Sequence, residues 1–477
     1  MSDSAPMPGF PDGFTWGAAT AAYQIEGATR DGGRGPSVWD TFAAQPGRIA
    51  DGGTGEVACD HYHRYAEDVA LMADLGIGAY RFSIAWPRIQ PAGTGPANAD
   101  GLAFYDRLVD ELLSHGIDPV ATLFHWDLPQ ALEDRGGWLT RDTAQRFAGY
   151  ADMVAERLAD RVRLWITLNE PFVHMTFGYG LGVHAPGRTE MFGAFPAAHH
   201  QLLGHGLAVA ALRARGAAAV GITNNYSPVR IIGAGTTTTD TGGGAGATST
   251  SGTSAGADPG TTSGGAELAD RAARDAYHAL HNRLFTDPLL GRGYPEQAPG
   301  LDLSVVRDGD LDVIAAPIDT LGVNYYNPTG VRAPEKGSPL PFELVPLAGF
   351  PRTSFDWPVV PDGLYDLLVG LRREYGAGLP PIQITENGCA YDDVVGPDGR
   401  CADPERIAYL DGHLRAVARA IDDGVDVRGY FVWSLLDNFE WAEGYTKRFG
   451  LVHVDYATQT RTPKSSFSWY RALINRR

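Results

Sequence analysis

Cysteine is scarce in this chain, which has only Cys59, Cys389 and Cys401 among its 477 residues. A set this small and odd in number excludes a disulfide framework, although a single bridge between Cys389 and Cys401 stays open. The fold must therefore depend on a hydrophobic core. The hydrophobic content of 44% is ordinary for a globular protein with a sizeable core.

Basic residues are also few relative to acidic ones. Lys and Arg number 39 against 57 Asp and Glu, which gives a formal net charge of −18 at pH 7. Nucleic acids and anionic membrane surfaces are bound through basic patches, so we expect neither class of partner. An acidic excess of this kind is typical of a soluble protein.

Long apolar runs are missing as well. No segment stays apolar over the roughly 20 residues that a membrane-spanning helix requires. The first residues, Met1-Ser-Asp-Ser-Ala-Pro, have neither the basic nor the apolar region of a secretory signal. We therefore expect a cytoplasmic protein, and the sequence gives no indication of its oligomeric state.

Metal-ligating patterns are absent too. His61 and His63 are two residues apart, but no nearby cysteine completes a site, and the helical pattern of 66–75 favours packing or capping. No spacing typical of calcium ligands occurs near the acidic pairs Asp392-Asp393 and Asp422-Asp423. We expect no metal.

What the chain does contain is a regular alternation of short apolar runs and longer amphipathic stretches. The apolar runs predict strands at Phe14–Thr20, Ala79–Trp86, Pro119–Phe124, Leu164–Asn169, Val220–Asn225, Thr320–Tyr325, Ile382–Thr385 and Gly429–Leu435. The amphipathic stretches predict helices at Leu102–His115, Arg141–Ala159, Ala197–Arg215, Ala266–Phe285, Leu364–Tyr375 and Pro404–Asp422.

Strands that alternate with helices form right-handed βαβ units with parallel strands. About eight such units predict an α/β fold, a single closed (β/α)₈ TIM barrel with long βα loops that forms one domain over 1–477. An open doubly wound sheet is the alternative. It is weakened because no glycine-rich phosphate-binding sequence follows the first strand.

One segment interrupts the pattern. Residues 233–265 are almost entirely Gly, Thr, Ser, Ala and Asp. A segment without apolar anchors cannot offset the entropy lost on ordering, so we interpret it as a mobile surface insertion after the fifth strand. The helical pattern resumes at Ala266, which favours an insertion within one domain over a linker between two.

Two of the predicted strands end at a glutamate. Leu164-Trp-Ile-Thr-Leu-Asn-Glu170-Pro and Pro381-Ile-Gln-Ile-Thr-Glu386-Asn-Gly both stop abruptly at the carboxylate. The carboxyl ends of parallel barrel strands meet at one face, where functional side chains collect. A pair of carboxylates at one site is what the cleavage of a glycosidic bond requires.

The other strand ends carry hydrogen-bonding groups and aromatic rings. Sugars need both kinds of side chain, because hydroxyls need donors and acceptors and the apolar face of a pyranose stacks on a ring. The strand ends supply Gln24, Arg81, His125, Trp126, Asn169, Asn324, Tyr326, Trp433, Glu440 and Trp441.

These motifs, taken in order, resemble those of glycoside hydrolase family 1, the β-glucosidase family. The resemblance runs from Phe10-Pro-Asp-Gly-Phe-Thr-Trp-Gly to Arg448-Phe-Gly-Leu-Val-His-Val-Asp-Tyr456 and so covers nearly the whole chain. It includes Tyr80-Arg-Phe-Ser-Ile-Ala-Trp-Pro-Arg88, Thr167-Leu-Asn-Glu-Pro171, Ile384-Thr-Glu-Asn-Gly388 and Trp433-Ser-Leu-Leu-Asp-Asn-Phe-Glu-Trp441.

The resemblance implies a retaining β-glucosidase without metal or organic cofactor, acting on small β-glucosides, with galactoside and fucoside hydrolysis and transglycosylation as side activities. Glu170 matches the general acid/base of the family and Glu386 its nucleophile. Arg81 and Tyr326 match the residues that support the nucleophile. A retaining mechanism predicts carboxyl groups about 5 Å apart.

The resemblance also implies a sugar-binding set. Asn169 matches the residue that binds the 2-hydroxyl, Glu440 the carboxylate that binds the 4- and 6-hydroxyls, and Trp433 the platform under the ring. Trp357 resembles the tryptophan on the aglycone side, although its flanking residues match less well. The rest of the predicted set is Gln24, His125, Trp126, Asn324, Trp441 and Phe449.

Three alternative functions remain at this point. A carbohydrate-binding protein without turnover would keep the pocket, but both glutamates are present. A transglycosylase would use the same covalent intermediate with a sugar or alcohol as acceptor. A phospho-β-glycosidase is disfavoured because a carboxylate at Glu440 should repel a 6-phosphate.

Overall fold

The computed structural model describes residues 7–232 and 263–475. Eight parallel strands close into a barrel, and the closing pair joins β1 to β11, with Gly17 opposite Phe431. The predicted closed barrel is thus confirmed over the open sheet. In barrel order the strands are β1 Thr15–Ala19, β11 Val427–Trp433, β10 Ile382–Asn387, β7 Thr320–Asn324, β5 Val220–Asn225, β4 Leu164–Asn169, β3 Asp118–Phe124 and β2 Ala79–Ser83.

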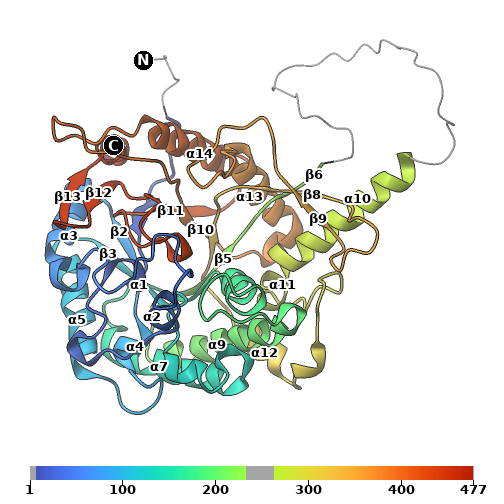
Figure 1. Ribbon diagram of the computed structural model, residues 1–477, viewed down its shortest axis with the longest axis horizontal. Helices are drawn as coiled ribbons and strands as arrows, with labels where there is room; N and C mark the ends of the chain where they lie inside the picture. The colour runs from blue at the N-terminus through green and yellow to red at the C-terminus, as the bar shows by residue number, and fades with distance from the viewer. Residues whose placement is uncertain (1–6, 233–262, 476–477) are drawn as a thin grey trace, which may run out of the picture.

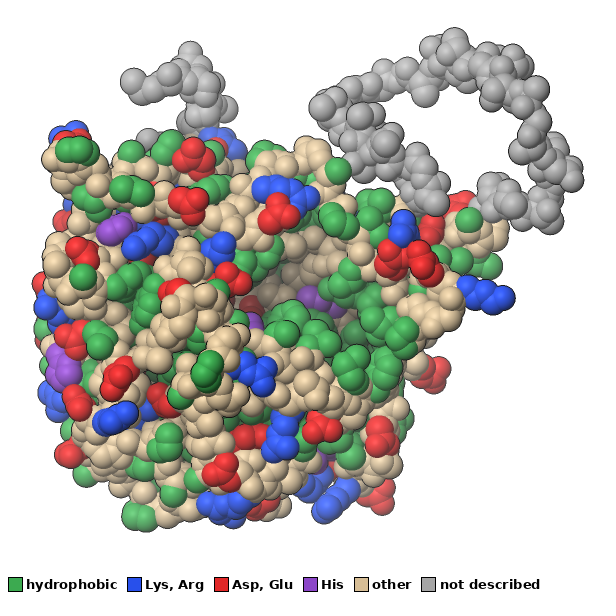
Figure 2. Space-filling view, in the orientation of Figure 1, with side chains coloured by type: hydrophobic (Ala, Val, Ile, Leu, Met, Phe, Trp, Pro, Cys, Tyr) green, Lys and Arg blue, Asp and Glu red, His purple; other side chains and the backbone are tan. Residues whose placement is uncertain are grey.

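Long helices lie around the outside of the barrel, and the chain runs once around it from the blue N-terminal part to the red C-terminal part (Figure 1). They are α3 His61–Leu75, α5 Ala99–Ser114, α7 Arg141–Leu158, α9 Phe195–Ala214, α10 Ser263–His278, α13 Pro361–Tyr375, α14 Pro404–Asp422 and α15 Ser465–Ile474. In the same orientation the molecule is hollowed near the middle of the face (Figure 2).

Shorter elements fill the connections. The short helices are α1 Ala22–Ile25, α2 Val38–Ala43, α4 Trp86–Ile89, α6 Gln130–Glu133, α8 Pro171–Val173, α11 Thr286–Leu289 and α12 Asp310–Ile314. Single 3₁₀ or π turns are η1 Asp31–Gly33, η2 Gly137–Leu139, η3 His174–Gly180, η4 Met191–Ala194, η5 Ala279–Arg283, η6 Leu303–Val305, η7 Gly376–Gly378 and η8 Trp441–Glu443. Two small sheets, not predicted from the sequence, are β6 Val229–Ile231 with β8 Thr329–Arg332 and β9 Glu343–Val345, and β12 Val452–Asp455 with β13 Thr460–Pro463.

Some strand and helix boundaries in the structure differ from the predicted ones. The strand predicted at Ala79–Trp86 ends at Ser83, because Trp86-Pro87 begins the short helix α4. The strand predicted at Ile382–Thr385 continues to Asn387, so Glu386 belongs to the strand itself. The helix predicted at Ala266–Phe285 is divided, because α10 gives way to the π turn η5.

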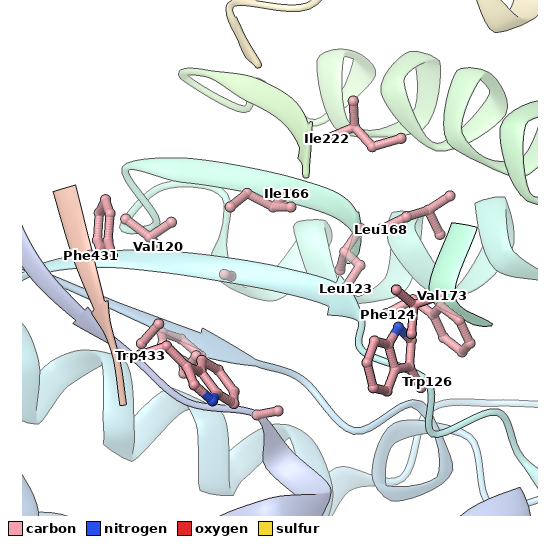
Figure 3. Close-up of a cluster of buried hydrophobic side chains, with 14 of the residues drawn as sticks. Val120, Leu123, Phe124, Trp126, Ile166, Leu168, Val173, Ile222, Phe431 and Trp433 are labelled. Carbon is pink, nitrogen blue, oxygen red and sulfur yellow. The ribbon is translucent and has the colours of Figure 1, made fainter. Parts of the chain in front are cut away.

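The barrel core explains the apolar runs. Every residue of β2 and β4 is buried, as expected for parallel strands covered on both faces. Val120, Ile166 and Phe431 belong to one cluster of buried side chains (Figure 3). Gly17 permits the closure at this point, since a Cβ there would lie only 2.3 Å from the Phe431 ring.

Three further expectations from the sequence can be compared with the structure. All three cysteines are free and buried, so the Cys389–Cys401 bridge is not formed. His61 is buried at the start of α3, with Nδ1 2.8 Å from Asp68 Oδ2. The predicted insertion lies outside the described residues as far as position 262, and 263–265 already belong to α10.

Over 7–232 and 263–475, none of the helices combines the length and hydropathy needed to cross a bilayer.

Candidate active site

Glu170 and Glu386 lie in the same cavity although 216 positions separate them in the chain (386 − 170). Glu170 follows β4, and Glu386 lies near the end of β10, so both stand at the carboxyl ends of barrel strands. Their side chains are almost buried, with exposed fractions of 4% and 3% for the two residues. The cavity has a volume of about 520 Å³.

The predicted site residues divide into two groups. One group lines the cavity together with the two glutamates: His125, Trp126, Tyr326, Trp357, Trp433, Glu440, Trp441 and Phe449. The other lies behind that lining and is hydrogen-bonded to it: Gln24, Arg81, Asn169 and Asn324. The structure therefore brings together all the residues that the sequence singled out.

Glu170 is held at the junction between strand and helix. Its φ of 46° is in the left-handed region, and Pro171 immediately starts α8, so the backbone turns sharply at the carboxylate. Oε1 accepts hydrogen bonds from Asn324 Nδ2 at 2.8 Å and from Asn225 Nδ2 at 3.0 Å. Two amides thus fix one oxygen of this carboxyl group and leave the other without a bond to either of them.

Glu386 is held by a cation and a phenol. Arg81 Nη1 donates to Oε1 at 2.7 Å, and the Tyr326 hydroxyl donates to Oε2 at 2.7 Å. Arg81 is itself fixed, because Nη2 donates to Asn169 Oδ1 at 2.6 Å and Nε donates to Thr122 Oγ1 at 3.2 Å. Both oxygens of Glu386 are therefore oriented by donors from elsewhere in the barrel, one from β2 and one from the segment that follows β7.

The surroundings assign different protonation states to the buried carboxyl groups. Burial and the negative charge of Glu386 raise the pKa of Glu170 to about 8, and the same two causes raise the pKa of Glu440 to about 8. Burial also raises the pKa of Glu386, but the Arg81 charge and the Tyr326 hydrogen bond oppose that rise. Glu386 is thus the carboxyl group that ionises first, and Glu170 keeps its proton near neutral pH.

Two polar residues at the base of the cavity each keep one buried atom free of hydrogen bonds with the described residues. Asn169 Nδ2 donates to His125 Nε2 at 2.9 Å, so the ring of His125 carries its proton on Nδ1. Gln24 Nε2 donates to Glu440 Oε2 at 3.2 Å. Within the described part of the chain, His125 Nδ1 and Gln24 Oε1 have no hydrogen-bond partner. A free donor and a free acceptor in a buried position are suited to a polar ligand.

Aromatic rings surround these polar groups. The ring of His125 lies 5.8 Å from Trp433 and 5.7 Å from Trp441 between centroids, and both pairs are nearly parallel. Trp126 Nε1 donates to the backbone oxygen of Asn169 at 2.8 Å, so Trp126 also positions that residue. The base of the cavity therefore combines flat apolar faces with hydrogen-bonding groups.

A second aromatic group borders Tyr326. The Trp357 ring lies 5.4 Å from the Tyr326 ring and stacks on Phe355 at 4.4 Å between centroids. Phe449 contacts the same group, 6.2 Å from Tyr326. Trp357 and Phe449 are thus placed beside the residue that donates to Glu386.

The sequence did not single out two polar residues of the site. Asn225 donates to Glu170, and His281 Nε2 lies 2.9 Å from Asn225 Oδ1 and so orients the amide. Asn225 is the last residue of the predicted fifth strand, so the strand-end argument could have found it. His281 lies in η5, within a stretch that the sequence presents as ordinary helix, and no local signal marks it.

Over the described ranges, no group of three or more His, Cys, Asp or Glu side chains is arranged to hold a metal ion.

Comparisons with known proteins extend over nearly the whole chain. The model of glycosyl hydrolase family 1 matches residues 7–236 and 248–477. Thermostable beta-glucosidase B of Thermobispora bispora is 51% identical, over 100% of this chain and 92% of that protein. A bifunctional beta-D-glucosidase/beta-D-fucosidase of Bifidobacterium breve is 45% identical, over 98% of both chains.

Solved structures also match over the whole fold. The beta-glucosidase of Thermotoga maritima in complex with glucoimidazole superposes with a TM-score of 0.86 at 42% identity, over 98% of each chain. The family model covers most of the chain, and the relatives are well above 30% identical over nearly their full length. This chain therefore belongs to glycosyl hydrolase family 1.

Proposed function

We propose that this chain is a retaining β-glucosidase that releases terminal non-reducing β-D-glucosyl residues from short β-glucosides. The observation that carries the proposal is the unequal treatment of two carboxyl groups in one cavity. Glu386 accepts hydrogen bonds from Arg81 and Tyr326, whereas burial and the charge of Glu386 raise the pKa of Glu170 to about 8. An ionised nucleophile beside a protonated acid is what the first step of retaining hydrolysis needs.

In that first step, a carboxylate oxygen of Glu386 attacks the anomeric carbon as the bond to the leaving oxygen breaks. Glu170 gives its proton to the leaving oxygen, and a covalent glucosyl ester forms on Glu386. The ester is uncharged, so the charge that raised the pKa of Glu170 is gone. Glu170 then takes a proton from the incoming water, which attacks the anomeric carbon from the β face and frees Glu386.

The glucosyl group is proposed to lie at the base of the cavity. Gln24, His125 and Glu440 supply hydrogen-bonding atoms there, two of which have no partner among the described residues. Trp433 offers an apolar face to the sugar ring. Since a relative is named as a bifunctional glucosidase and fucosidase, we expect fucoside and galactoside hydrolysis as side activities, with transglycosylation at high acceptor concentration.

The proposed chemistry uses the two carboxyl groups, the Arg81 cation, uncharged hydrogen-bond donors and water. We propose one catalytic domain over 1–477, in which residues 233–262 take no part in the chemistry. A cytoplasmic location stays a prediction, as does the separation of about 5 Å between the two carboxyl groups.

Replacement of the nucleophile tests the proposal. In Glu386→Gly, hydrolysis of an aryl β-glucoside should fall by several orders of magnitude, and azide or formate should restore turnover by occupying the place of the carboxylate. Proton NMR of the first sugar released by the unmodified protein should show the β anomer. Glu56→Gly, which changes an exposed glutamate outside the cavity, is the matched control. Full activity of Glu386→Gly, or release of the α anomer, would refute the assignment.

A further inference from the structure

Beyond the two glutamates, the wall of the cavity becomes apolar. Leu181, Met191, Phe192 and Leu344 line it and are 46%, 54%, 42% and 55% exposed. They are four of the twelve large apolar side chains that are exposed over 7–232 and 263–475. Exposed apolar side chains that gather in one hollow indicate a binding surface. Figure 2 shows hydrophobic side chains gathered along one side of this hollow.

One apolar wall comes from the connection between β4 and α9. Val173 ends α8, Phe177 lies in η3, and Met191 and Phe192 form the first half of η4. All four line the cavity. Phe192 lies against the backbone of Gly300, where a Cβ would be 2.6 Å from the ring, so the ring packs closely on a neighbouring segment of the cavity lining.

A second apolar wall comes from segments more than 85 positions further along the chain (280 − 192 = 88). Leu280 lies in η5, and Leu340, Phe342 and Leu344 lie in and before β9. Phe342 packs edge-on against Tyr277 of α10, with centroids 5.1 Å apart. The two walls thus belong to separate connections of the barrel, and neither is part of the glucose-binding base.

Several polar side chains of this outer region are hydrogen-bonded to one another, whereas Thr176 Oγ1 and His184 Nδ1, which also belong to cavity-lining residues, have no partner among the described residues. The Tyr277 hydroxyl lies 2.9 Å from His281 Nδ1, and His281 Nε2 lies 2.9 Å from Asn225 Oδ1. Ser227 Oγ lies 2.6 Å from Thr329 Oγ1 and donates to the backbone oxygen of Asn327 at 3.0 Å. The described part of the outer region therefore offers two free polar atoms against many apolar ones, too few to replace the water around the several hydroxyls of a second sugar.

We infer that the outer half of the cavity selects an apolar aglycone, an alkyl or aromatic group, over a second glucose unit. The inference rests on the proposed function, since it concerns the leaving alcohol of the same reaction. The walls would remove the aglycone from water while its oxygen stays within reach of Glu170. Because these walls do not contact the reacting carbon, burial of the aglycone against them stabilises the bound substrate and the transition state alike.

An alkyl series tests the inference without a change in the leaving group. Methyl, butyl, hexyl and octyl β-D-glucosides release alkanols of nearly equal acidity, so differences in kcat/KM report binding of the chain. We expect kcat/KM to rise about three-fold for each added methylene up to hexyl, the effect of burying most of each group. Octyl glucoside should also exceed cellobiose. A flat series, or a preference for cellobiose, would overturn the inference.

Variants at the exposed rim locate the effect. In the double variant Met191→Gln, Leu344→Gln, the increase in kcat/KM for each added methylene should fall below about 1.5-fold, because both side chains lose their apolar surface. Val394→Gln removes a 73% exposed apolar side chain that does not line the cavity, and it should keep the full rise. An equal rise in all three proteins would assign the chain-length effect to another surface and refute the proposed walls.

A binding measurement separates the two proposals. Alkyl 1-thio-β-D-glucosides are cleaved poorly, so their inhibition constants report affinity in the unmodified protein even if a variant fails to fold. These constants should fall about three-fold per methylene. If glucosides are cleaved and neither series depends on chain length, the aglycone inference alone fails. If no glucoside is cleaved, the proposed function fails. The dissociation constants of the same thioglucosides, measured by direct binding, then still decide whether the apolar walls hold an alkyl chain.

Discussion

The Arg81 guanidinium donates to Glu386 Oε1 across 2.7 Å, in a buried pair that joins β2 to β10 on different sides of the barrel. Three acidic side chains, Glu170, Glu386 and Glu440, are buried in one cavity, and the guanidinium is bonded to only one of them. A buried carboxylate is costly unless it is paired. Arg81 therefore determines which carboxyl group carries the charge, and the charge of Glu386 in turn raises the pKa of the other two.

The protonation of Glu170 predicts the alkaline side of the pH profile. Because Glu170 must carry a proton to assist the leaving group and its pKa is raised to about 8, kcat/KM should fall as the pH rises through about 8. Glu170→Gln should abolish this limb when measured with a dinitrophenyl glucoside, whose leaving group needs no proton. A basic limb that persists unchanged in Glu170→Gln would assign the titration to another group.

The same raised pKa predicts a gain in stability for Glu170→Gln. The folded protein holds this proton to about pH 8, whereas the unfolded chain releases it near the ordinary glutamate value of 4.5. The folded state therefore binds more protons between these values, and its stability relative to the unfolded chain decreases as the pH rises through that window.

Glu170→Gln lacks this titration. Its free energy of unfolding should therefore exceed that of the unmodified protein by an advantage that grows from pH 5 to pH 8, by an amount on the order of a few kcal/mol. Urea unfolding of both proteins at the two pH values provides the measurement. Glu405→Gln, at an exposed position of α14, should show no such growth. An advantage that shrinks toward pH 8 would mean that Glu170 is ionised in the folded protein.

Loss of the Tyr326 hydroxyl should affect the acidic side of the profile. Tyr326→Phe removes a 2.7 Å hydrogen bond to Glu386 Oε2 that favours the ionised form. The pKa of Glu386 should rise, so the acidic limb of kcat/KM should move to higher pH. At the optimum the rate should fall roughly 10- to 100-fold, the usual effect of losing a hydrogen bond to a charged group. An unmoved acidic limb would indicate that Tyr326 does not support the nucleophile.

Glu440 is expected to exclude phosphorylated substrates. The pKa of Glu440 is raised to about 8, so the test is made at about pH 9, where this side chain is ionised. In Glu440→Gln at that pH, the ratio of kcat/KM for a 6-phospho-β-glucoside to that for its neutral counterpart should rise at least about ten-fold, because a negative charge facing the 6-position is removed. Hydrolysis of the neutral glucoside should fall at the same time, since a charged acceptor is lost. An unchanged ratio would place the 6-hydroxyl away from Glu440, and efficient cleavage of the phospho-substrate by the unmodified protein would reverse the substrate assignment.

The fold could be predicted from the sequence because its information is local. Strand β4 and helix α14 have the bounds that the apolar pattern predicts. The errors occur where the pattern carries no information. The chain turns at Trp86-Pro87 within an apolar run, and α10 changes to a π turn at Ala279 although the apolar spacing continues.

The candidate site divides in the same way. Glu170 and Glu386 could be found because each ends an apolar run, and parallel strands in a barrel end at one face. The pairing of Arg81 with Glu386 followed only from the family resemblance, since the two residues are 305 positions apart and no pattern links them. Asn225 could have been found because it ends a predicted strand, whereas no strand end marks His281, which orients it.

Neighbouring residues encode the alternation of strands and helices and the carboxylates at two strand ends, because side-chain periodicity and strand termination are local properties. The folded barrel, in contrast, is needed to see which carboxyl group meets the guanidinium and how two distant connections, around Phe192 and Leu344, line one apolar cavity mouth. Protonation depends on charges and burial contributed by the whole barrel, and a pocket wall depends on which loops meet in space. Neither quantity is encoded in any short stretch of the chain.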